Sequence, residues 1–343
     1  MTITRRRVVA GALAAPAVIA AGRLRSASAA QTFKISHQFP GGTIAEGDFR
    51  DRLCRIFAAE LEKRTHGELA AQVYPNSSLM KTVAQFSALR KGALDLTLYP
   101  ISYAGGEFAE LNIGLMPGLV SSYKQGEAWK RSAVGQKFSA FLAEKGVVIV
   151  SWIWQAGGMA SRTIPIVNPG DAKDLKIRGG SREMDMVLQA AGAATLSLPS
   201  NEIYAAMQTG ACDAALTSST SLISFRLEEI SKALTTGRGK SYWFMLEPLI
   251  MSKQIFDALS KSQRDVIMAL GLELEKFGTK EAMADDQKVA NVYAKKGAKV
   301  LDLSEAAVDK WRGIARTTAW KDYADKTALS AELLKLAEQV PIS

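Results

Sequence analysis

The stretch Asp174-Leu-Lys-Ile-Arg178-Gly-Gly, followed by Pro199-Ser-Asn-Glu-Ile-Tyr-Ala-Ala-Met-Gln-Thr-Gly-Ala-Cys-Asp213, decides how this chain folds. Its first part alternates the apolar residues Leu175 and Ile177 with charged neighbours, as a half-buried strand does, and two glycines then end the strand. Arg178 therefore lies where a strand meets a loop. A guanidinium is always protonated and can form two parallel hydrogen bonds, so an arginine at this position suits the capture of a carboxylate.

The second part of the stretch predicts a helix over residues 201–209. Ser200 is a suitable N-cap, Glu202 is a first-turn acid that favours the helix dipole, and Gly210 ends the helix. Residues 212–217 then predict another strand. Strands that alternate with helices in this way are typical of α/β folds.

Together, these elements resemble the extracytoplasmic solute receptors of tripartite ATP-independent periplasmic (TRAP) transporters. Members of that family carry a Gly-Leu-Lys-Ile-Arg-like strand, a Pro-x-x-Glu-x-Tyr-x-Ala-x-Gln-x-Gly helix and a Val-Asp-Gly strand, at the spacings found here from Lys176 to Asp213. The resemblance covers nearly the whole mature chain. It implies an α/β, two-lobed periplasmic binding protein-like fold, with a ligand cleft between the lobes and a long bracing helix.

The first 30 residues have the features of a targeting signal. Thr4-Arg5-Arg6-Arg7-Val8-Val9 leads into an apolar run that ends at Ala21, and a small-residue segment follows ahead of Gln31. This pattern predicts a twin-arginine signal peptide. Because the apolar run is shorter than the roughly 20 residues that a membrane span needs, we expect a periplasmic mature protein that is not embedded in the membrane.

The charge of the chain changes when this segment is removed. Residues 1–30 carry five arginines and no acid, so the formal net charge falls from +9 to +4 (38 Lys and Arg against 34 Asp and Glu). The remaining chain has no Lys/Arg run interleaved with aromatic residues, so we expect no nucleic-acid partner. A modest positive charge suits the attraction of small anions.

The mature length exceeds the usual size of one core and predicts two lobes. We expect the division to be 31–154 and 242–275 in lobe I, 155–241 and 298–343 in lobe II, and 262–297 as a long helix spanning both. Crossings between the lobes are expected at residues 151–157 and 237–242. Residues 147–154 and 241–252 are each expected to form one strand, and 125–145 one helix.

Cys54 and Cys212 fall in different lobes of this division, so we expect two buried thiols rather than a disulfide.

The family resemblance implies a set of ligand contacts at the ends of strands. They are His37, Gln38, Tyr99, Arg178, Thr217 and Ser218. Arg178 is the expected carboxylate clamp, and the alternative is a structural ion pair with Glu183 or Asp185. A second arginine, which many relatives carry, is missing here or displaced to Arg162. The segment Leu216-Thr217-Ser218-Ser219 also departs from a Gln-Glu-Asn-Pro phrase of many relatives, so the polar pattern around the ligand differs.

Three tryptophans near the expected crossings are further candidates. Strand alternation places Trp152 and Trp154 on one face, and Trp243 lies near the second crossing. These indoles line the cleft against an apolar or aromatic ligand body, or they belong to the core beside the hinge. With one arginine clamp, the former alternative favours a monocarboxylate, such as an aromatic, 2-oxo or hydroxy acid.

The resemblance implies a receptor that captures an organic acid and delivers it to TRAP membrane permease subunits. A solute sensor for a membrane signalling partner is an alternative. An enzyme is disfavoured because His37 and His66, the two histidines, lack metal-ligand spacing, and no nucleophile elbow, His-Glu-x-x-His or phosphate loop is present. We therefore expect no catalytic residues, metal or cofactor.

Overall fold

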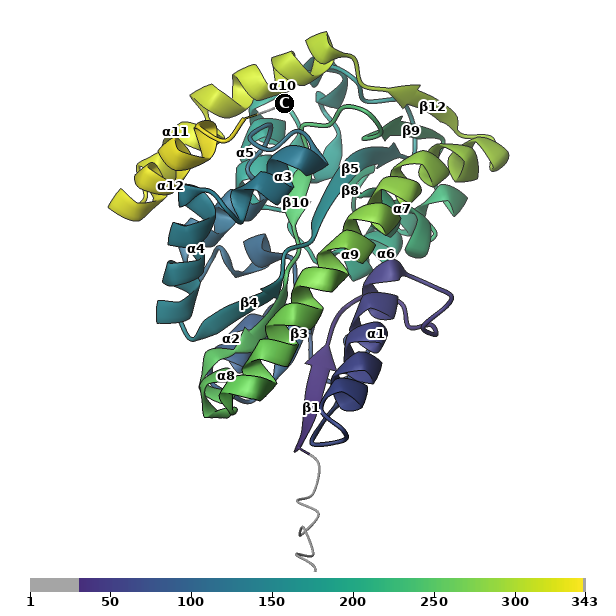
Figure 1. Ribbon diagram of the computed structural model, residues 1–343. Coiled ribbons are helices and arrows are strands. Elements are labelled where there is room, and N and C mark those ends of the chain that lie inside the picture. Colours follow the sequence, from purple (N-terminus) through teal and green to yellow (C-terminus); the bar gives the residue numbers. More distant parts are fainter. Residues whose placement is uncertain (1–30, 342–343) are drawn as a thin grey trace, which may run out of the picture.

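The computed structural model describes residues 31–341, so the expected signal peptide, residues 1–30, lies outside the described residues. Two β-sheets lie one above the other in Figure 1, with helices packed around each of them. We call the sheet that contains β1 (Gln31–Ser36), with its helices, lobe I, and the sheet that contains β8 (Ala214–Ser218), with its helices, lobe II. The expected two-lobed α/β fold is confirmed.

The sheet of lobe I has five strands, in the order β2 (Leu69–Tyr74), β1, β3 (Leu96–Leu98), β11 (Leu249–Ser252) and β4 (Val147–Ser151). β1 is parallel to β2 and β3, whereas β11 is inserted antiparallel between β3 and β4. The helices between or directly after these strands are α1 (Phe49–Arg64), α2 (Gln85–Arg90), α3 (Tyr123–Trp129), α4 (Ala133–Glu144) and α8 (Lys253–Ala258).

Local sequence explains where α1 begins and which face it buries. The side chain of Asp48 accepts a hydrogen bond from the backbone N–H of Arg50 and so caps the helix. The apolar stripe of α1, which includes Leu53, Phe57 and Leu61, is buried, and α1 packs against β2 and α9. The start of α1 lies next to the segment that follows β1, because Asp51 contacts His37 at 3.1 Å.

The sheet of lobe II has the strand order β12 (Lys299–Asp302), β9 (Ala233–Thr236), β5 (Trp154–Ser161), β8, β6 (Lys176–Arg178) and β7 (Ala194–Thr195). A further strand, β10 (Phe244–Leu246), pairs antiparallel with the start of β5. Its helices are α5 (Arg182–Ala190), α6 (Ile203–Gln208), α7 (Ser219–Ser224), α10 (Glu305–Thr317) and α11 (Ala319–Ala324).

The chain passes between the two sheets three times, at two short segments and through the helix that leads from β11 to β12. The first is Trp152 and Ile153, which separate β4 from β5, so residues 147–154 form parts of two strands rather than one. The second is Glu247 and Pro248, which separate β10 from β11. Because β10 pairs with β5 of lobe II, this crossing lies later than residues 237–242, where the sequence had placed it. The expected helix 125–145 is likewise two helices, α3 and α4.

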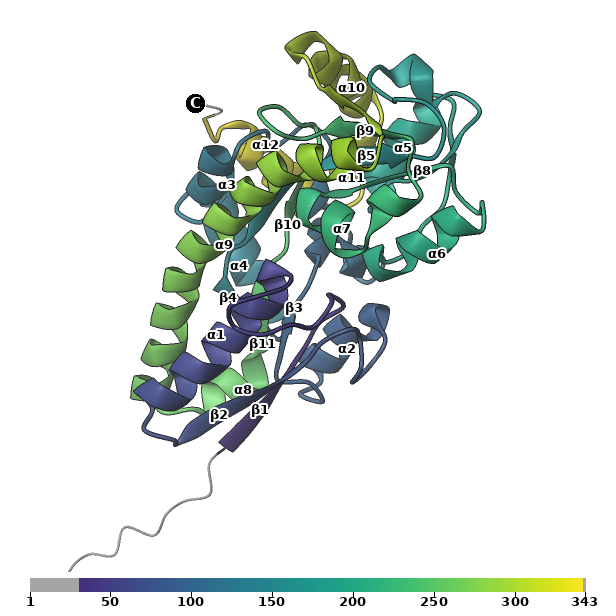
Figure 2. The ribbon, with the colours of Figure 1, turned by 90° about the vertical axis from the view of Figure 1, so that its right-hand side faces the viewer.

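The long helix α9 (Lys261–Lys295) runs past both sheets (Figures 1 and 2). It begins with a capping box between Ser260 and Gln263. A Cβ at Gly271 would lie 1.9 Å from the carbonyl oxygen of Val150, and one at Gly278 would lie 2.7 Å from the side chain of Ile153. The two glycines therefore let α9 lie directly against the first crossing, which offsets their low helix propensity.

The C-terminal helices attach to both lobes. α10 and α11 pack against α5, whereas the last helix, α12 (Ala328–Glu338), packs against α4 and the 3₁₀ segment η3 (Ala109–Leu115). Cys54 and Cys212 are buried free thiols, one in α1 and one ahead of β8. Within residues 31–341, no helix combines the length and apolar character needed to cross a membrane.

Candidate ligand-binding site

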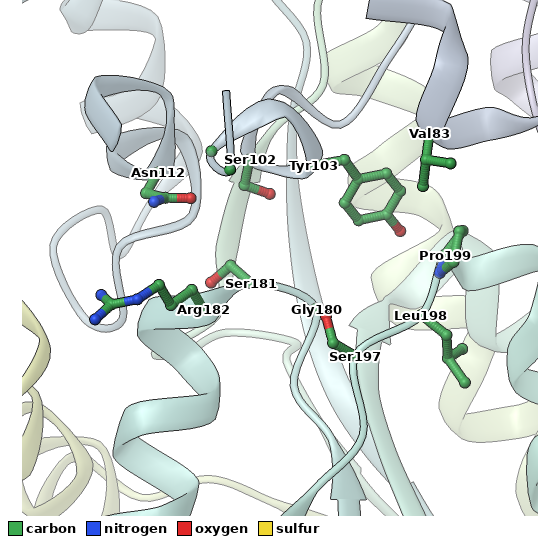
Figure 3. A pocket seen from close by; sticks show the side chains of 12 residues that line it. Val83, Ser102, Tyr103, Asn112, Gly180, Ser181, Arg182, Ser197, Leu198 and Pro199 are labelled. Atoms are coloured by element: carbon green, nitrogen blue, oxygen red, sulfur yellow. The ribbon is translucent and has the colours of Figure 1, made fainter. Parts of the chain in front are cut away.

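A cavity of about 310 Å³ lies between the two lobes next to Arg178. Figure 3 shows side chains of lobe I facing those of lobe II across it. Lobe I contributes Val83, Ser102, Tyr103, Gly105, Gly106 and Asn112, and lobe II contributes Gly180, Ser181, Arg182, Ser197, Leu198 and Pro199. Hydroxyl and amide groups are prominent in this lining, which suits a small polar ligand.

Arg178 is the last residue of β6, and its side chain is almost fully buried. Its Nε donates to the carbonyl oxygen of Leu198 at 3.0 Å, its Nη1 to that of Leu216 at 2.7 Å, and its Nη2 to the hydroxyl of Tyr103 at 2.8 Å. A guanidinium has five N–H groups. One N–H on each terminal nitrogen thus remains without a partner in the described part of the chain.

The loop after β6 is shaped around this guanidinium. Gly180 has a φ of 98°, and a Cβ there would lie 2.7 Å from Nη1 of Arg178, so a side chain at this position is excluded. The indole Nε1 of Trp243 donates to the carbonyl oxygen of Gly179 at 3.2 Å and holds the same loop. Trp243 therefore supports the loop next to Arg178, but it is not among the residues that line the cavity.

The alternative role for Arg178, a structural ion pair, is not found in residues 31–341. Arg178 forms no salt bridge there, and all three of its hydrogen bonds go to uncharged oxygens. Burial raises the pKa of Glu183 and of Asp185 to about 7, and the nearby Arg178 lowers that of Asp185 only in part. Within residues 31–341, no carboxylate therefore forms an ion pair with Arg178, so its positive charge is available to an anion.

The expected lobe I contacts divide into two kinds. His37 is fully engaged within lobe I, because its Nε2 lies 3.1 Å from Asp51 and its Nδ1 accepts from the backbone N–H of Phe39 at 3.2 Å. By contrast, the amide of Gln38 and the hydroxyl of Tyr99 are buried without a partner among the described residues. The Tyr99 ring lies edge-on to that of Tyr103, which lines the cavity.

Thr217 and Ser218 end β8 close to the clamp, since the carbonyl oxygen of the preceding Leu216 accepts from Arg178. Both side chains are buried. The hydroxyl of Ser218 caps α7 by accepting from the backbone N–H of Ser221 at 3.2 Å. It is therefore used, at least partly, to begin that helix.

The structure places three other candidates away from the cavity. Trp152 packs edge-on to Phe138 of α4, and Trp154 packs edge-on to Trp129 of α3, so both indoles belong to the core behind the crossing. Arg162 follows the end of β5, where its backbone N–H donates to the carbonyl oxygen of Asp213, directly ahead of β8. Arg162 lies beside Asp213 and Arg178 pairs with Ala215, so the two arginines flank β8 on opposite sides, and Arg162 is not among the residues that line the cavity.

The family model for the bacterial extracellular solute-binding protein family 7 matches residues 44–326. This chain belongs to that family. A solute-binding protein of Albidiferax ferrireducens is 67% identical over 306 residues, which cover 89% of this chain and 90% of the relative. Members of the family are receptors for solutes, so this chain is a solute-binding receptor and not an enzyme.

Solved structures of TRAP periplasmic solute-binding proteins share the fold. The crystal structure of one from Rhodoferax ferrireducens with bound malonate is 66% identical to this chain, with a TM-score of 0.89 over 90% of this chain and 98% of that one. DctP7, a Bordetella pertussis extracytoplasmic solute receptor binding pyroglutamic acid, is 21% identical, with a TM-score of 0.80 over 90% and 100% of the two chains.

This receptor also has a buried ionic cluster between its lobes, which the sequence did not reveal. Arg50 of α1 pairs with Asp48 at 2.7 Å and with Glu247 of the second crossing at 3.4 Å, and all three side chains are fully buried. Its Nη1 also donates to Ser221 of α7 at 3.0 Å and to Ser218 at 3.4 Å. We call these five residues the interlobe cluster, because Arg50 joins lobe I to lobe II through them.

Burial opposes ionisation of the acids in this cluster, but the pKa values of Asp48 and Glu247 shift in opposite directions. Although burial acts against it, Arg50 holds the pKa of Asp48 below its ordinary value. Burial raises the pKa of Glu247 to about 7, because Arg50 offsets desolvation only in part and the charge of Asp48 adds to it. The amide of Gln155 in β5 donates to Glu247 and links the second crossing to lobe II.

Glu247 should make the stability of this receptor depend on pH. Its carboxyl binds a proton more tightly in the folded chain (pKa about 7) than at its ordinary pKa of 4.5, so its contribution to stability falls as pH rises through that window. Urea unfolding gives the free energy of unfolding at pH 5 and at pH 8. The decrease in this free energy from pH 5 to pH 8 should be smaller for Glu247→Gln than for the wild type, by up to about 3 kcal/mol. Identical pH dependence in both proteins would contradict the raised pKa.

Proposed function

We propose that this receptor binds a small organic acid anion in the cavity between its lobes and delivers it to TRAP-type membrane permease subunits. The observation that carries the proposal is Arg178, a buried cation that forms no ion pair within residues 31–341 and donates to Leu198 and Tyr103, which line the cavity, while one N–H on each of Nη1 and Nη2 has no partner in those residues. A carboxylate accepts two parallel hydrogen bonds from such a pair. The malonate bound to the 66% identical structure supports the same ligand class.

Around this clamp, the other polar groups would orient the ligand. Gln38 and Tyr99 of lobe I have buried polar atoms without partners in residues 31–341, and Thr217 and Ser218 end the strand next to Arg178. Trp243 supports the loop that carries Gly180. A ligand that contacts both lobes binds the closed form more tightly than the open form, and this difference would drive closure.

The lining favours a small polar acid over one with an aromatic body. The expectation of an aromatic body depended on Trp152 and Trp154, whose indoles pack against α3 and α4 instead. Ser102, Asn112 and Ser181 face the cavity and can bind further oxygen atoms of a ligand. Export through a twin-arginine signal in residues 1–30 to the periplasm is part of the same proposal.

A binding screen tests the proposal directly. Purified protein is melted with malonate, succinate, lactate, pyruvate and benzoate, and with malonamide as the uncharged counterpart of malonate. A ligand at 100 times its dissociation constant stabilises the native state by about 2.7 kcal/mol, so a true ligand should raise Tm by a few degrees. We expect shifts with small polar acids and none with malonamide.

Two results of this screen would contradict the proposal. An equal shift with malonamide would show that the carboxylate charge is not recognised. A well-folded protein that responds to none of the acids, at concentrations up to several millimolar, would show that its solute belongs to another chemical class.

A further inference from the structure

Tyr103 is the residue of lobe I that touches the clamp. It lies in the 3₁₀ segment η2 (Ile101–Ala104), directly after β3. Its hydroxyl accepts from Nη2 of Arg178 at 2.8 Å and from the backbone N–H of Ser200 at 3.0 Å. Both donors belong to lobe II, so one phenol oxygen joins the two lobes at the edge of the cavity. In Figure 3 its ring points across the cavity towards Leu198 and Pro199.

The two hydrogen bonds that the Tyr103 hydroxyl accepts leave it able only to donate its own proton. A phenol has two acceptor positions and one O–H donor. Arg178 and Ser200 fill both acceptor positions, and the O–H has no acceptor among residues 31–341. Accepting two hydrogen bonds, one of them from a cation, polarises the O–H and strengthens it as a donor. Tyr103 therefore offers a proton to an oxygen in the cavity that it lines.

The oxygen that Tyr103 reaches is different from the one that Arg178 holds. The two N–H groups of Nη2 diverge by about 120°, so an anion oxygen on the second of them lies about 5 Å from the phenol oxygen, beyond hydrogen-bonding distance. A ligand with a single carboxylate on Arg178 would leave the Tyr103 proton without an acceptor. A second oxygen-bearing group, a few ångströms from the first, would accept it.

We propose that Tyr103 determines ligand specificity by donating its hydroxyl proton to a second oxygen-bearing group of the acid held by Arg178. The inference rests on the proposed function and narrows its ligand to acids with a second carboxylate, hydroxyl or oxo group near the first. The same hydroxyl holds one terminal nitrogen of Arg178 in place. Its loss would weaken the binding of every acid, but most of all the binding of acids with the second group.

Tyr103→Phe separates these two effects when two matched ligands are compared. Malonate and propionate share one carboxylate and the adjoining methylene, but propionate has a methyl group in place of the second carboxylate. Isothermal titration gives both dissociation constants for the wild type and for the variant. We expect the preference for malonate over propionate to fall roughly tenfold or more in Tyr103→Phe, because a hydrogen bond to a charged group is lost.

Tyr74→Phe is the matched control. Tyr74 also lies in lobe I, but its hydroxyl donates to Gln72 on the edge strand β2 and neither residue lines the cavity, so the ligand preference should stay at the wild-type value. An equal loss for malonate and propionate in Tyr103→Phe would overturn the inference and leave Tyr103 with the positioning of Arg178 alone. A wild type that binds neither of these two acids, nor any other acid of the screen, would overturn the carboxylate proposal itself, together with this role for Tyr103.

Discussion

Arg178→Ala should weaken the binding of an organic acid by roughly 2 to 5 kcal/mol, which is about thirtyfold to several thousandfold in Kd. The guanidinium is buried and has no salt bridge in the described chain, so the bound anion would be its main counter-charge. Arg178→Lys should lose most of the same free energy. An ammonium is a point charge and cannot form two parallel hydrogen bonds with one carboxylate.

Arg162→Ala is the control for this prediction, because both arginines flank β8 but only Arg178 of the two donates to Leu198 and Tyr103, which line the cavity. We expect its Kd to equal that of the wild type. Isothermal titration at one ionic strength, with thermal melts to show that each variant folds, makes the comparison. Unchanged affinity in Arg178→Ala and Arg178→Lys would exclude Arg178 as the clamp, and a large loss in Arg162→Ala would assign that function to the other arginine.

Arg50→Ala should lower the free energy of unfolding by roughly 3 to 5 kcal/mol at neutral pH. Removing one partner of a buried ion pair leaves the other charge without compensation. In the interlobe cluster two acids lose their partner at once, since Asp48 and Glu247 both pair with Arg50 and both are fully buried. The guanidinium also lies 3.7 Å from the ring centroid of Phe39, and this cation–π contact is lost as well.

Arg52→Ala is the matched control on the same helix. Arg52 pairs with Glu281 of α9 at 2.7 Å, but both side chains are partly exposed, so the loss should be less than about 1 kcal/mol. Urea unfolding at pH 7 measures both variants. Equal and small effects at the two positions would show that the buried charges of the interlobe cluster contribute no more than a surface pair.

The sequence could predict the position of Arg178 because the evidence for it is local. Alternation at Leu175 and Ile177 defines β6, and the glycines that follow define its end. The length of α9 was predictable for a similar reason, since residues 262–297 have a continuous helical pattern. Features that depend on a few neighbouring residues can be found in this way.

Tyr103 and the interlobe cluster could not be predicted in this way. Tyr103 and Arg178 are 75 positions apart in the sequence, and Arg50 and Glu247 are 197 positions apart. No local pattern encodes such a pairing. One signal was present for Tyr103, since it follows the same strand end as the candidate Tyr99.

The strand aromatics show a second limit. Alternation indicated that Trp152 and Trp154 share a face, but it could not say whether that face meets the cavity or the core. The break between β4 and β5 was hidden as well, because the run 147–154 is apolar on both sides of it. Residues that are buried in one sheet look the same in sequence as residues that are buried in the next.

The insertion of β11 between β3 and β4 sets an order of events during synthesis. β3 and β4 are complete once residue 151 has been made, yet neither pairs with the other, and each waits for residues 249–252. The second sheet waits longer still, because its outermost strand, β12, ends at residue 302. A nascent chain that stops between these points has open strand edges, which can pair with other chains. The chain must therefore be made as far as residue 252 before the sheet of lobe I is complete, and as far as residue 302 before that of lobe II is complete.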